Sequence, residues 1–151
     1  MPSISEKTRL QVRHRAGGYC EYCLSQEFFS STPFSIEHIN PVSKGGDNRL
    51  DNLALACQGC NGFKYNKTHH FDAVSQQLVP LYHPRKDLWE HHFTWNVDFT
   101  RIIGITPVGR TTIDCLKLNR AEAVNLRQLL IVFGEHPPKG YPKEGEAAPD
   151  D

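Results

Sequence analysis

Two pairs of cysteines constrain the fold of this chain more than any other feature. Cys20 and Cys23 form the first pair, and Cys57 and Cys60 form the second. Each pair offers two sulfur atoms at the spacing that a tetrahedral zinc ion accepts from a tight turn, and two pairs complete a four-sulfur structural site. The fifth cysteine, Cys115, stands far from both pairs in the sequence. We therefore predict one structural zinc with Cys115 as a spare thiol, and we prefer this to redox motifs.

Composition indicates a small domain with a modest core. The chain has 151 residues, of which 38% are hydrophobic, so a structural metal would help it to fold. Residues 1–133 carry 15 Lys and Arg against 12 Asp and Glu, whereas residues 134–151 carry two against five. The formal net charge of zero thus hides a mildly basic body and an acidic tail. We predict a single compact domain over residues 1–138 and a disordered tail over residues 139–151.

The sequence contains neither an apolar run near 18 residues nor a secretory signal. We therefore expect a cytoplasmic protein with no membrane partner, a setting in which metal-bound cysteines are commoner than disulfides.

Acidic, imidazole and amide side chains lie between and just after the cysteine pairs. In chain order these are Glu37-His38-Ile39-Asn40-Pro41, Gly45-Gly46, Asn52-Leu53, and Asn61 and Lys64 beside the second pair. This pattern resembles the HNH endonucleases of the zinc-knuckle subgroup. The resemblance implies an α+β fold, with a zinc-stapled ββα-metal core over about residues 17–68.

The resemblance also implies roles for individual residues. Glu37 and Asn61 would hold a catalytic Mg²⁺ or Mn²⁺, an ion that prefers oxygen ligands. His38 would act as the general base that activates water. Asn52 would orient the histidine by tying the loop between two strands. Two positions depart from the commoner pattern, because Glu37 stands where Asp is usual and Asn61 where His is usual.

A lone Glu-His pair on a strand is more often a surface pair, but the framing cysteines, glycines and Asn52 favour the catalytic interpretation here. The adjacent histidines at 69–70 and 91–92 are alternative metal ligands that we consider weaker, since adjacent residues of an extended chain point apart.

The first half of the chain is predicted to contain short helices and a strand. Ser5 and the glycines at 17–18 bound a predicted helix. The further expected elements are a strand at 35–40, a loop at 41–49, a helical turn at 50–56 and a short helix at 60–66.

The second half predicts a companion layer of two strands and two helices over residues 80–134. Residues 69–79 are weakly helical, and 80–84 form an extended connector. Residues 87–92 favour one or two helical turns. The alternation over 93–99 predicts a strand and 101–106 a second one. Thr106 and Pro107 open a helix that runs to about residue 118, and Asn119 caps another with an apolar stripe. The stripe consists of Ala123, Leu126, Leu130 and Phe133.

Several basic residues are predicted to contact a nucleic-acid backbone, although a solvated surface explains a basic helix equally well. The assigned residues are Arg13, Arg15, Lys44, Lys64 and Lys67, with Arg101, Arg110, Arg120 and Arg127 as weaker candidates.

The function that the sequence favours is metal-dependent hydrolysis of double-stranded DNA with weak sequence preference. One alternative is a catalytically silent, zinc-dependent nucleic-acid-binding module. Another is a structural adaptor that uses the strand at 93–99 as an interaction edge. The target sequence and the oligomeric state stay open.

Overall fold

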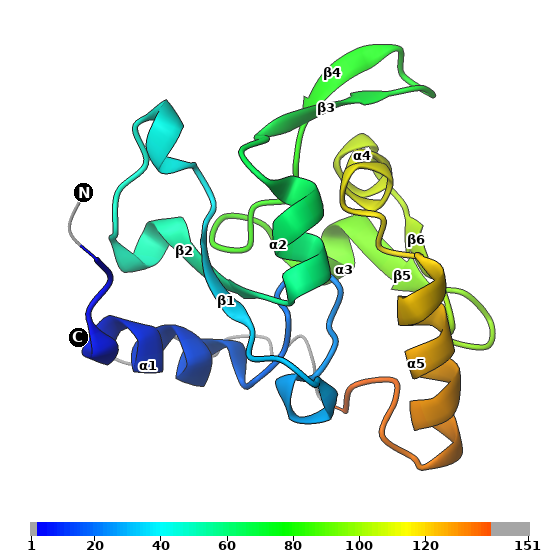
Figure 1. The fold of residues 1–151 in the computed structure, drawn as a ribbon. Coiled ribbons are helices and arrows are strands. Elements are labelled where there is room, and N and C mark those ends of the chain that lie inside the picture. Colours follow the sequence, from blue (N-terminus) through cyan, green and yellow to red (C-terminus); the bar gives the residue numbers. More distant parts are fainter. Residues whose placement is uncertain (1–2, 140–151) are drawn as a thin grey trace.

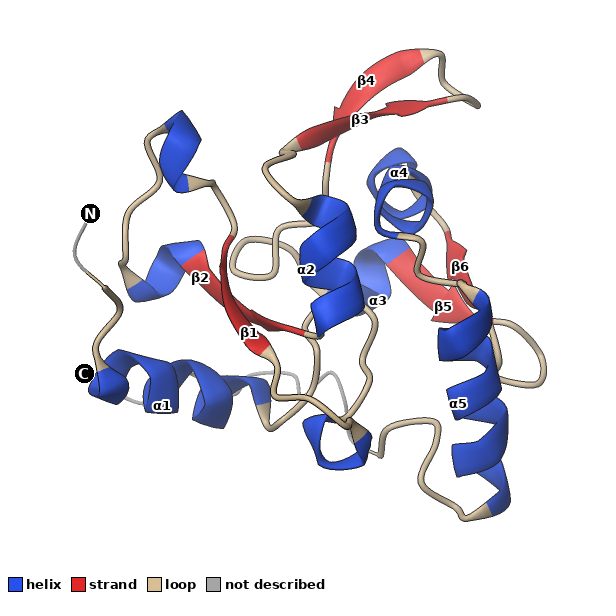
Figure 2. Cartoon of the chain, viewed as in Figure 1, coloured by secondary structure: helices blue, strands red, loops and turns tan. Residues whose placement is uncertain are grey.

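The computed structural model describes residues 3–139, which form five α-helices and three separate antiparallel hairpins (Figures 1 and 2). The elements are α1 (Glu6–Ala16), β1 (Ser35–His38), β2 (Leu53–Ala56), α2 (Gln58–Lys64), β3 (His69–Asp72), β4 (Gln77–Pro80), α3 (Trp89–His92), β5 (Phe93–Trp95), β6 (Ile102–Gly104), α4 (Pro107–Leu116) and α5 (Ala121–Val132). The predicted disordered tail lies, apart from residue 139, outside the described residues.

Helix α1 has the ends that the sequence predicts. The Ser5 side chain accepts a hydrogen bond from the Thr8 amide at 3.1 Å, and Gly17 ends the helix with a φ of 63°. The helix buries Val12 and Ala16 in the hydrophobic core and contacts β2. Its role is therefore to cover one face of the first hairpin.

The first hairpin and α2 form the ββα unit (Figure 1). Strand β1 pairs with β2 in the register that sets Glu37 opposite Ala54 and His38 opposite Leu53. The predicted helical turn at 50–56 was too long: a 3₁₀ turn occupies Leu50–Asn52, and the rest is strand β2. All four residues of β2 are buried, so its sequence lacks the alternation of apolar and polar residues that predicts a half-exposed strand.

The predicted weak helix at 69–79 is wrong, because this stretch forms the hairpin β3–β4. The inner face of the hairpin carries Asp72 and Val79, whereas Phe71 and Leu78 face solvent. Its turn contains Gln76 with a φ of 60°, a conformation that glycine or asparagine more often supplies. The sequence thus lacks the usual hairpin signal.

The predicted strand at 93–99 ends early, at Trp95. The side-chain oxygen Oδ1 of Asn96 accepts hydrogen bonds from the backbone amides of Thr100 and Arg101, and these bonds close the loop that follows. Val97 is consequently 96% exposed. An adaptor edge of seven residues, as one alternative requires, is therefore not present.

Helices α4 and α5 complete the companion layer. Thr106 caps α4 through a bond from the Gly109 amide at 3.0 Å, as predicted. The predicted cap of α5 is wrong, since Arg120 precedes that helix and Asn119 instead bonds to both backbone groups of Ile102. The layer contains the two strands and two helices predicted for it, and α3 lies within the predicted helical turns at 87–92. The hairpin β3–β4 precedes this layer in the sequence.

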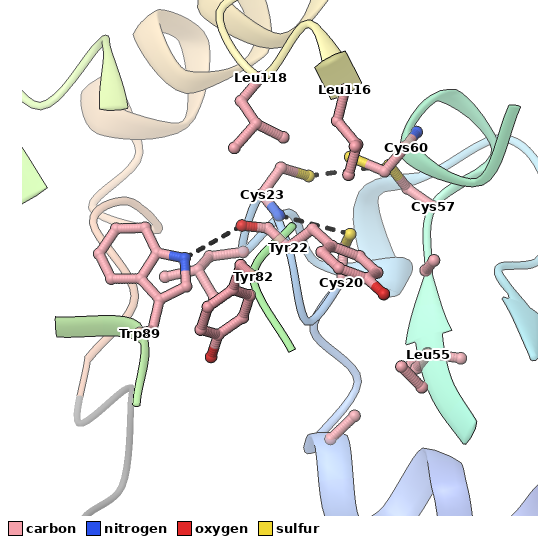
Figure 3. Close-up of a cluster of buried hydrophobic side chains, with 14 of the residues drawn as sticks. Cys20, Tyr22, Cys23, Leu55, Cys57, Cys60, Tyr82, Trp89, Leu116 and Leu118 are labelled. Atoms are coloured by element: carbon pink, nitrogen blue, oxygen red, sulfur yellow. Dashed lines mark hydrogen bonds between the residues drawn. The ribbon is translucent and has the colours of Figure 1, made fainter. Parts of the chain in front are cut away.

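One continuous cluster of buried side chains joins the two halves of the chain. It includes Val12 and Leu55 from the first half and Trp89, Phe93 and Leu116 from the second. The Trp89 indole donates to the Tyr22 carbonyl at 3.0 Å, which fixes the companion layer beside the first cysteine pair (Figure 3). No helix within residues 3–139 has the length and apolar character to cross a bilayer.

Candidate zinc centre and active-site groove

The four predicted zinc ligands meet in one buried cluster. Cys20 and Cys23 come from the turn after α1, and Cys57 and Cys60 from the start of α2. Their sulfur atoms all lie within 4.8 Å of one another, and Cys23 Sγ lies 3.7 Å from Cys57 Sγ (Figure 3). Tetrahedral zinc with Zn–S bonds of about 2.3 Å sets sulfurs about 3.8 Å apart. The cluster therefore fits zinc in donor type and in spacing.

Arg120 contacts this cluster from the companion layer. Its Nη2 lies 3.3 Å from Cys57 Sγ, and its Nη1 lies 3.7 Å from Cys60 Sγ. Burial acts to lower the pKa of Arg120, but the thiolates of Cys60, Cys23 and Cys57 outweigh it and raise that pKa.

Gly59 leaves room for this guanidinium, because a Cβ at position 59 would lie only 2.6 Å from Arg120 Nη2. Arg120 thus supplies hydrogen bonds and positive charge to a centre that carries about two negative charges when four thiolates bind Zn²⁺. Arg120 therefore contacts cysteine sulfurs inside the fold, whereas the sequence analysis considered it as a contact for nucleic acid.

An open groove of about 350 Å³ is lined by residues of β1, of α2 and its end, and of the loop that follows β1. Its walls consist of Ile36, Glu37, His38, Pro41, Val42, Ser43, Asn61, Tyr65 and Asn66. The structure therefore brings Glu37, His38 and Asn61 to one groove. The histidine pairs at 69–70 and 91–92 are not among its lining residues.

His38 is held in this groove by a residue that the sequence analysis missed. Asn48 Oδ1 lies 2.8 Å from His38 Nε2. A carbonyl oxygen only accepts hydrogen bonds, so this contact places the ring proton on Nε2 and leaves a lone pair on Nδ1. The position of Asn48, two residues after Gly45-Gly46, was the only available signal.

Asn52 ties the loop that carries Asn48. Its Oδ1 accepts from the Asn40 amide at 2.8 Å, and its Nδ2 donates to the carbonyls of Asn40 and Asp47 at 3.0 and 2.9 Å. Gly46 permits this close approach, because a Cβ there would lie 1.8 Å from the Asn40 oxygen. The hydrogen bonds expected of Asn52 are thus present, and they reach the histidine through Asn48.

Glu37 is the buried residue of β1, whereas its neighbour His38 is only half-buried, and both line the groove. Its Oε2 accepts from the Tyr22 hydroxyl at 2.7 Å, and its Oε1 lies 2.5 Å from Lys64 Nζ. Burial raises the pKa of Glu37, although Lys64 and Tyr22 counteract part of that effect. Oε1 accepts no hydrogen bond in addition to this ion pair.

Asn61 projects from the middle of α2 and lines the groove. Within residues 3–139 its side-chain amide has no hydrogen-bond partner. Asn61 is thus available to a ligand, and Glu37 has one oxygen engaged only by a lysine. Carboxylate and amide oxygens are the ligand types that Mg²⁺ and similar divalent ions prefer. The ion would replace Lys64 as the positive charge beside Glu37.

Three predicted phosphate contacts are used inside the fold instead. Lys64 is 1% exposed and donates to the Ile39 carbonyl at 2.9 Å as well as pairing with Glu37. Arg13 donates to the Phe34 carbonyl, and Arg15 donates to two carbonyls beside β2, those of Leu50 and Leu53. Long basic side chains can cap carbonyl groups of neighbouring elements, and sequence alone does not show which carbonyls are within reach.

Of the weaker arginine candidates, Arg110 pairs with Asp72 and Arg127 donates to the carbonyls of Thr100 and Leu118. Lys44, Lys67 and Arg101 are exposed and stay available to a nucleic acid.

Residues 20–67 match the family model described as HNH endonuclease. The predicted resemblance is therefore confirmed for this segment, and its four cysteines are positioned for a zinc site as in the zinc-knuckle subgroup. The mixed helix-and-strand structure around the cluster is consistent with the predicted α+β class with a ββα-metal core. No curated protein and no solved structure matches the chain. The HNH segment indicates a nuclease-type or nucleic-acid-related function with a zinc site.

Proposed function

We propose that this protein is a metal-dependent endonuclease that hydrolyses phosphodiester bonds in DNA. The observation that supports it best is the groove in which His38, fixed through Nε2 by Asn48, shares the walls with Asn61, whose side-chain amide bonds to no residue within 3–139. A protein that only binds nucleic acid has no need for a histidine oriented in this way. The HNH match over residues 20–67 supports the same reaction class.

His38 is the general base in this proposal. Its Nδ1 lone pair accepts a proton from a water molecule, and the water oxygen attacks the phosphorus of the scissile phosphate. The bond from phosphorus to the 3′ oxygen breaks, and the leaving oxygen takes up a proton from solvent. The products carry a 5′ phosphate and a 3′ hydroxyl. Asn48 and Asn52 are positioning residues, because they hold the ring and the loop without touching the substrate.

Glu37 and Asn61 would hold Mg²⁺ or Mn²⁺. When bound, such an ion stabilises the charge that develops on the phosphate and on the leaving oxygen. The cysteine cluster has a separate role, since zinc with four thiolates has no open position and serves the fold.

The basic residues around the groove suit a DNA backbone. Lys44 and Lys67 are both exposed, and in the sequence they directly follow the groove-lining residues Ser43 and Asn66. A second groove of about 520 Å³ is lined by Lys7, Arg49 and the same Asn48 that contacts His38. We therefore expect DNA binding that weakens with added salt and depends little on sequence, since phosphate contacts carry no base information.

A supercoiled-plasmid assay with Mg²⁺, Mn²⁺ or no added ion tests the proposal. We expect nicked or linear product only with a divalent ion, and loss of product in His38→Ala. The alternative, a silent zinc-dependent binding module, predicts DNA binding without product under every condition.

A further inference from the structure

Tyr65 occupies a backbone position that suits glycine better than tyrosine. The Lys67 amide donates to the Lys64 carbonyl at 2.9 Å, which closes a turn with Tyr65 at its first central position. The backbone angles of Tyr65, φ 50° and ψ −113°, are close to those of a type II′ turn, where glycine predominates. A bulky side chain at such a φ strains the backbone.

Within residues 3–139, no hydrogen bond or ring contact of the Tyr65 side chain offsets this strain. Tyr65 is 75% exposed, whereas Tyr22, between the first pair of cysteines, is completely buried. Among residues 3–139, the Tyr65 hydroxyl has no hydrogen-bond partner and the ring stacks on no other ring. The aromatic ring therefore contributes little to packing, and its use is more consistent with a molecule outside the chain.

The ring stands at the groove that holds the proposed catalytic residues. Tyr65 directly follows the last residue of α2, and its side chain lines the groove together with Asn61 and His38. The exposed residues Lys44 and Lys67 directly follow the groove-lining residues Ser43 and Asn66 in the sequence. A ligand for this combination must offer negative charge to the lysines and a flat apolar face to the ring. A nucleotide offers both.

We propose that Tyr65 stacks on a base next to the scissile phosphate and thereby favours DNA that is single-stranded or unpaired at that point. The inference rests on the proposed function, because it places the scissile phosphate in this groove. In an intact duplex both faces of each base are covered, so a stacking side chain selects substrates whose base is already free or easily extruded.

Binding of fluorescein-labelled oligonucleotides without added Mg²⁺ or Mn²⁺ tests this inference independently of cleavage. One probe is a duplex with a short unpaired stretch, and the other is its fully paired counterpart. The parent protein should bind the unpaired probe more tightly. Tyr65→Ala and Tyr65→Gly should weaken that binding by roughly 5- to 150-fold, the usual effect of removing one base-stacking ring, and should remove the preference. Tyr65→Phe should keep both.

Two controls separate stacking from folding. Tyr65→Gly relieves the backbone strain, so its melting temperature should equal or exceed that of the parent while its binding falls. Phe133→Ala removes another exposed aromatic ring, at the end of α5 and outside the groove, and should leave binding unchanged.

Parental binding by Tyr65→Ala would overturn the inference, and so would a loss in Tyr65→Phe as large as in Tyr65→Ala or an equal loss on both probes. If the parent cuts no plasmid but the Tyr65-dependent preference is present, the proposed hydrolysis fails and the stacking site stands. If the plasmid is cut but the Tyr65 variants match the parent on both probes, only the stacking site fails.

Discussion

Lys64 Nζ lies 2.5 Å from Oε1 of Glu37, and both side chains are almost completely enclosed. The lysine comes from the last turn of α2 and the glutamate from β1, so the pair joins the two elements that a ββα unit must hold together. It also places a positive charge beside the carboxylate proposed to hold a divalent ion. The fold and the catalytic ion would therefore compete for one oxygen of Glu37.

Lys64→Met should make the protein depend on divalent ions for stability. Loss of the lysine leaves the Glu37 carboxylate buried without a countercharge, which costs about 3–5 kcal/mol for buried pairs in general. If Glu37 is an ion ligand, Mg²⁺ or Mn²⁺ should restore part of the melting temperature. The measurement is a melting curve with and without the ion.

The double variant Glu37→Gln/Lys64→Met is the matched control. It has no carboxylate to compensate, so the ion should not raise its melting temperature. An equal effect of the ion on the single and double variants would show that Glu37 does not bind it.

Acid should weaken the contact between the β3–β4 hairpin and α4. Arg110 donates to both carboxylate oxygens of Asp72, and this contact, with the Ser75 amide, lowers the pKa of Asp72. A lowered pKa in the folded state contributes stability above the unfolded pKa of about 3.9 and loses it as the pH falls. The melting temperature of the parent should therefore exceed that of Asp72→Asn at pH 6.

This difference should shrink as the pH falls below about 4, near the unfolded pKa of Asp. Comparing parent and variant at each pH cancels acid release of zinc, which affects both proteins. A difference that stays constant down to the lowest pH would mean that Asp72 contributes by shape rather than by charge.

The sequence predicts the local parts of this molecule better than its long-range contacts. Ser5 and Thr106 act within a few residues, and the helix starts follow from them; the sulfur cluster is the one long-range contact that was predicted, because two close cysteine pairs indicate a shared zinc ion. The β3–β4 hairpin was missed because Gln76 adopts a left-handed turn conformation without glycine or asparagine. Strand propensity also gives little guidance where a strand is half-exposed and carries histidines.

Within the candidate site, the residue types were predictable but their partners were not. Lys64 follows Asn61 by one helical turn, which suggested a phosphate contact; only the packing of α2 against β1 shows that it points to Glu37. No motif marks Tyr65, and Asn48 is marked only by its position two residues after Gly45-Gly46. Their significance comes from a 2.8 Å contact with His38 and from a strained, exposed ring, and neither is visible in a one-dimensional pattern.

The zinc centre should contain about one ion per chain and should depend on Arg120. Because the guanidinium contacts Cys57 and Cys60, Arg120→Gln should release zinc faster to a chromogenic chelator and lower the melting temperature. Cys115→Ser is the control: Cys115 lies in α4, outside the sulfur cluster, so its zinc content and release should match the parent. Release from Arg120→Gln at the parental rate would limit Arg120 to packing.

Asn48 should affect the pH dependence of cleavage more than the fold. Asn48→Ala removes the acceptor for His38 Nε2 and should lower kcat by up to about 10²-fold, because the base is then misplaced. Asn48→Asp keeps an acceptor but favours the protonated ring, so cleavage should require a higher pH than in the parent. The pH–rate profile distinguishes the two variants, and identical profiles for both would remove Asn48 from the mechanism.

Substitutions of the base, the carboxylate and a zinc ligand should have different effects. His38→Ala should keep its zinc, its melting temperature and its DNA binding, yet lose cleavage by roughly 10²–10⁴-fold, the contribution expected of a general base. Glu37→Ala should also lose cleavage, but with weaker binding of Mg²⁺ or Mn²⁺. Cys57→Ser should differ from both by lowering the melting temperature, since the binding energy of a structural zinc is folding energy. Paired melting curves and plasmid-nicking time courses for the three variants provide the measurement. If His38→Ala cuts at the parental rate, His38 is not the base, and the orientation that Asn48 and Asn52 give to its ring must serve another purpose.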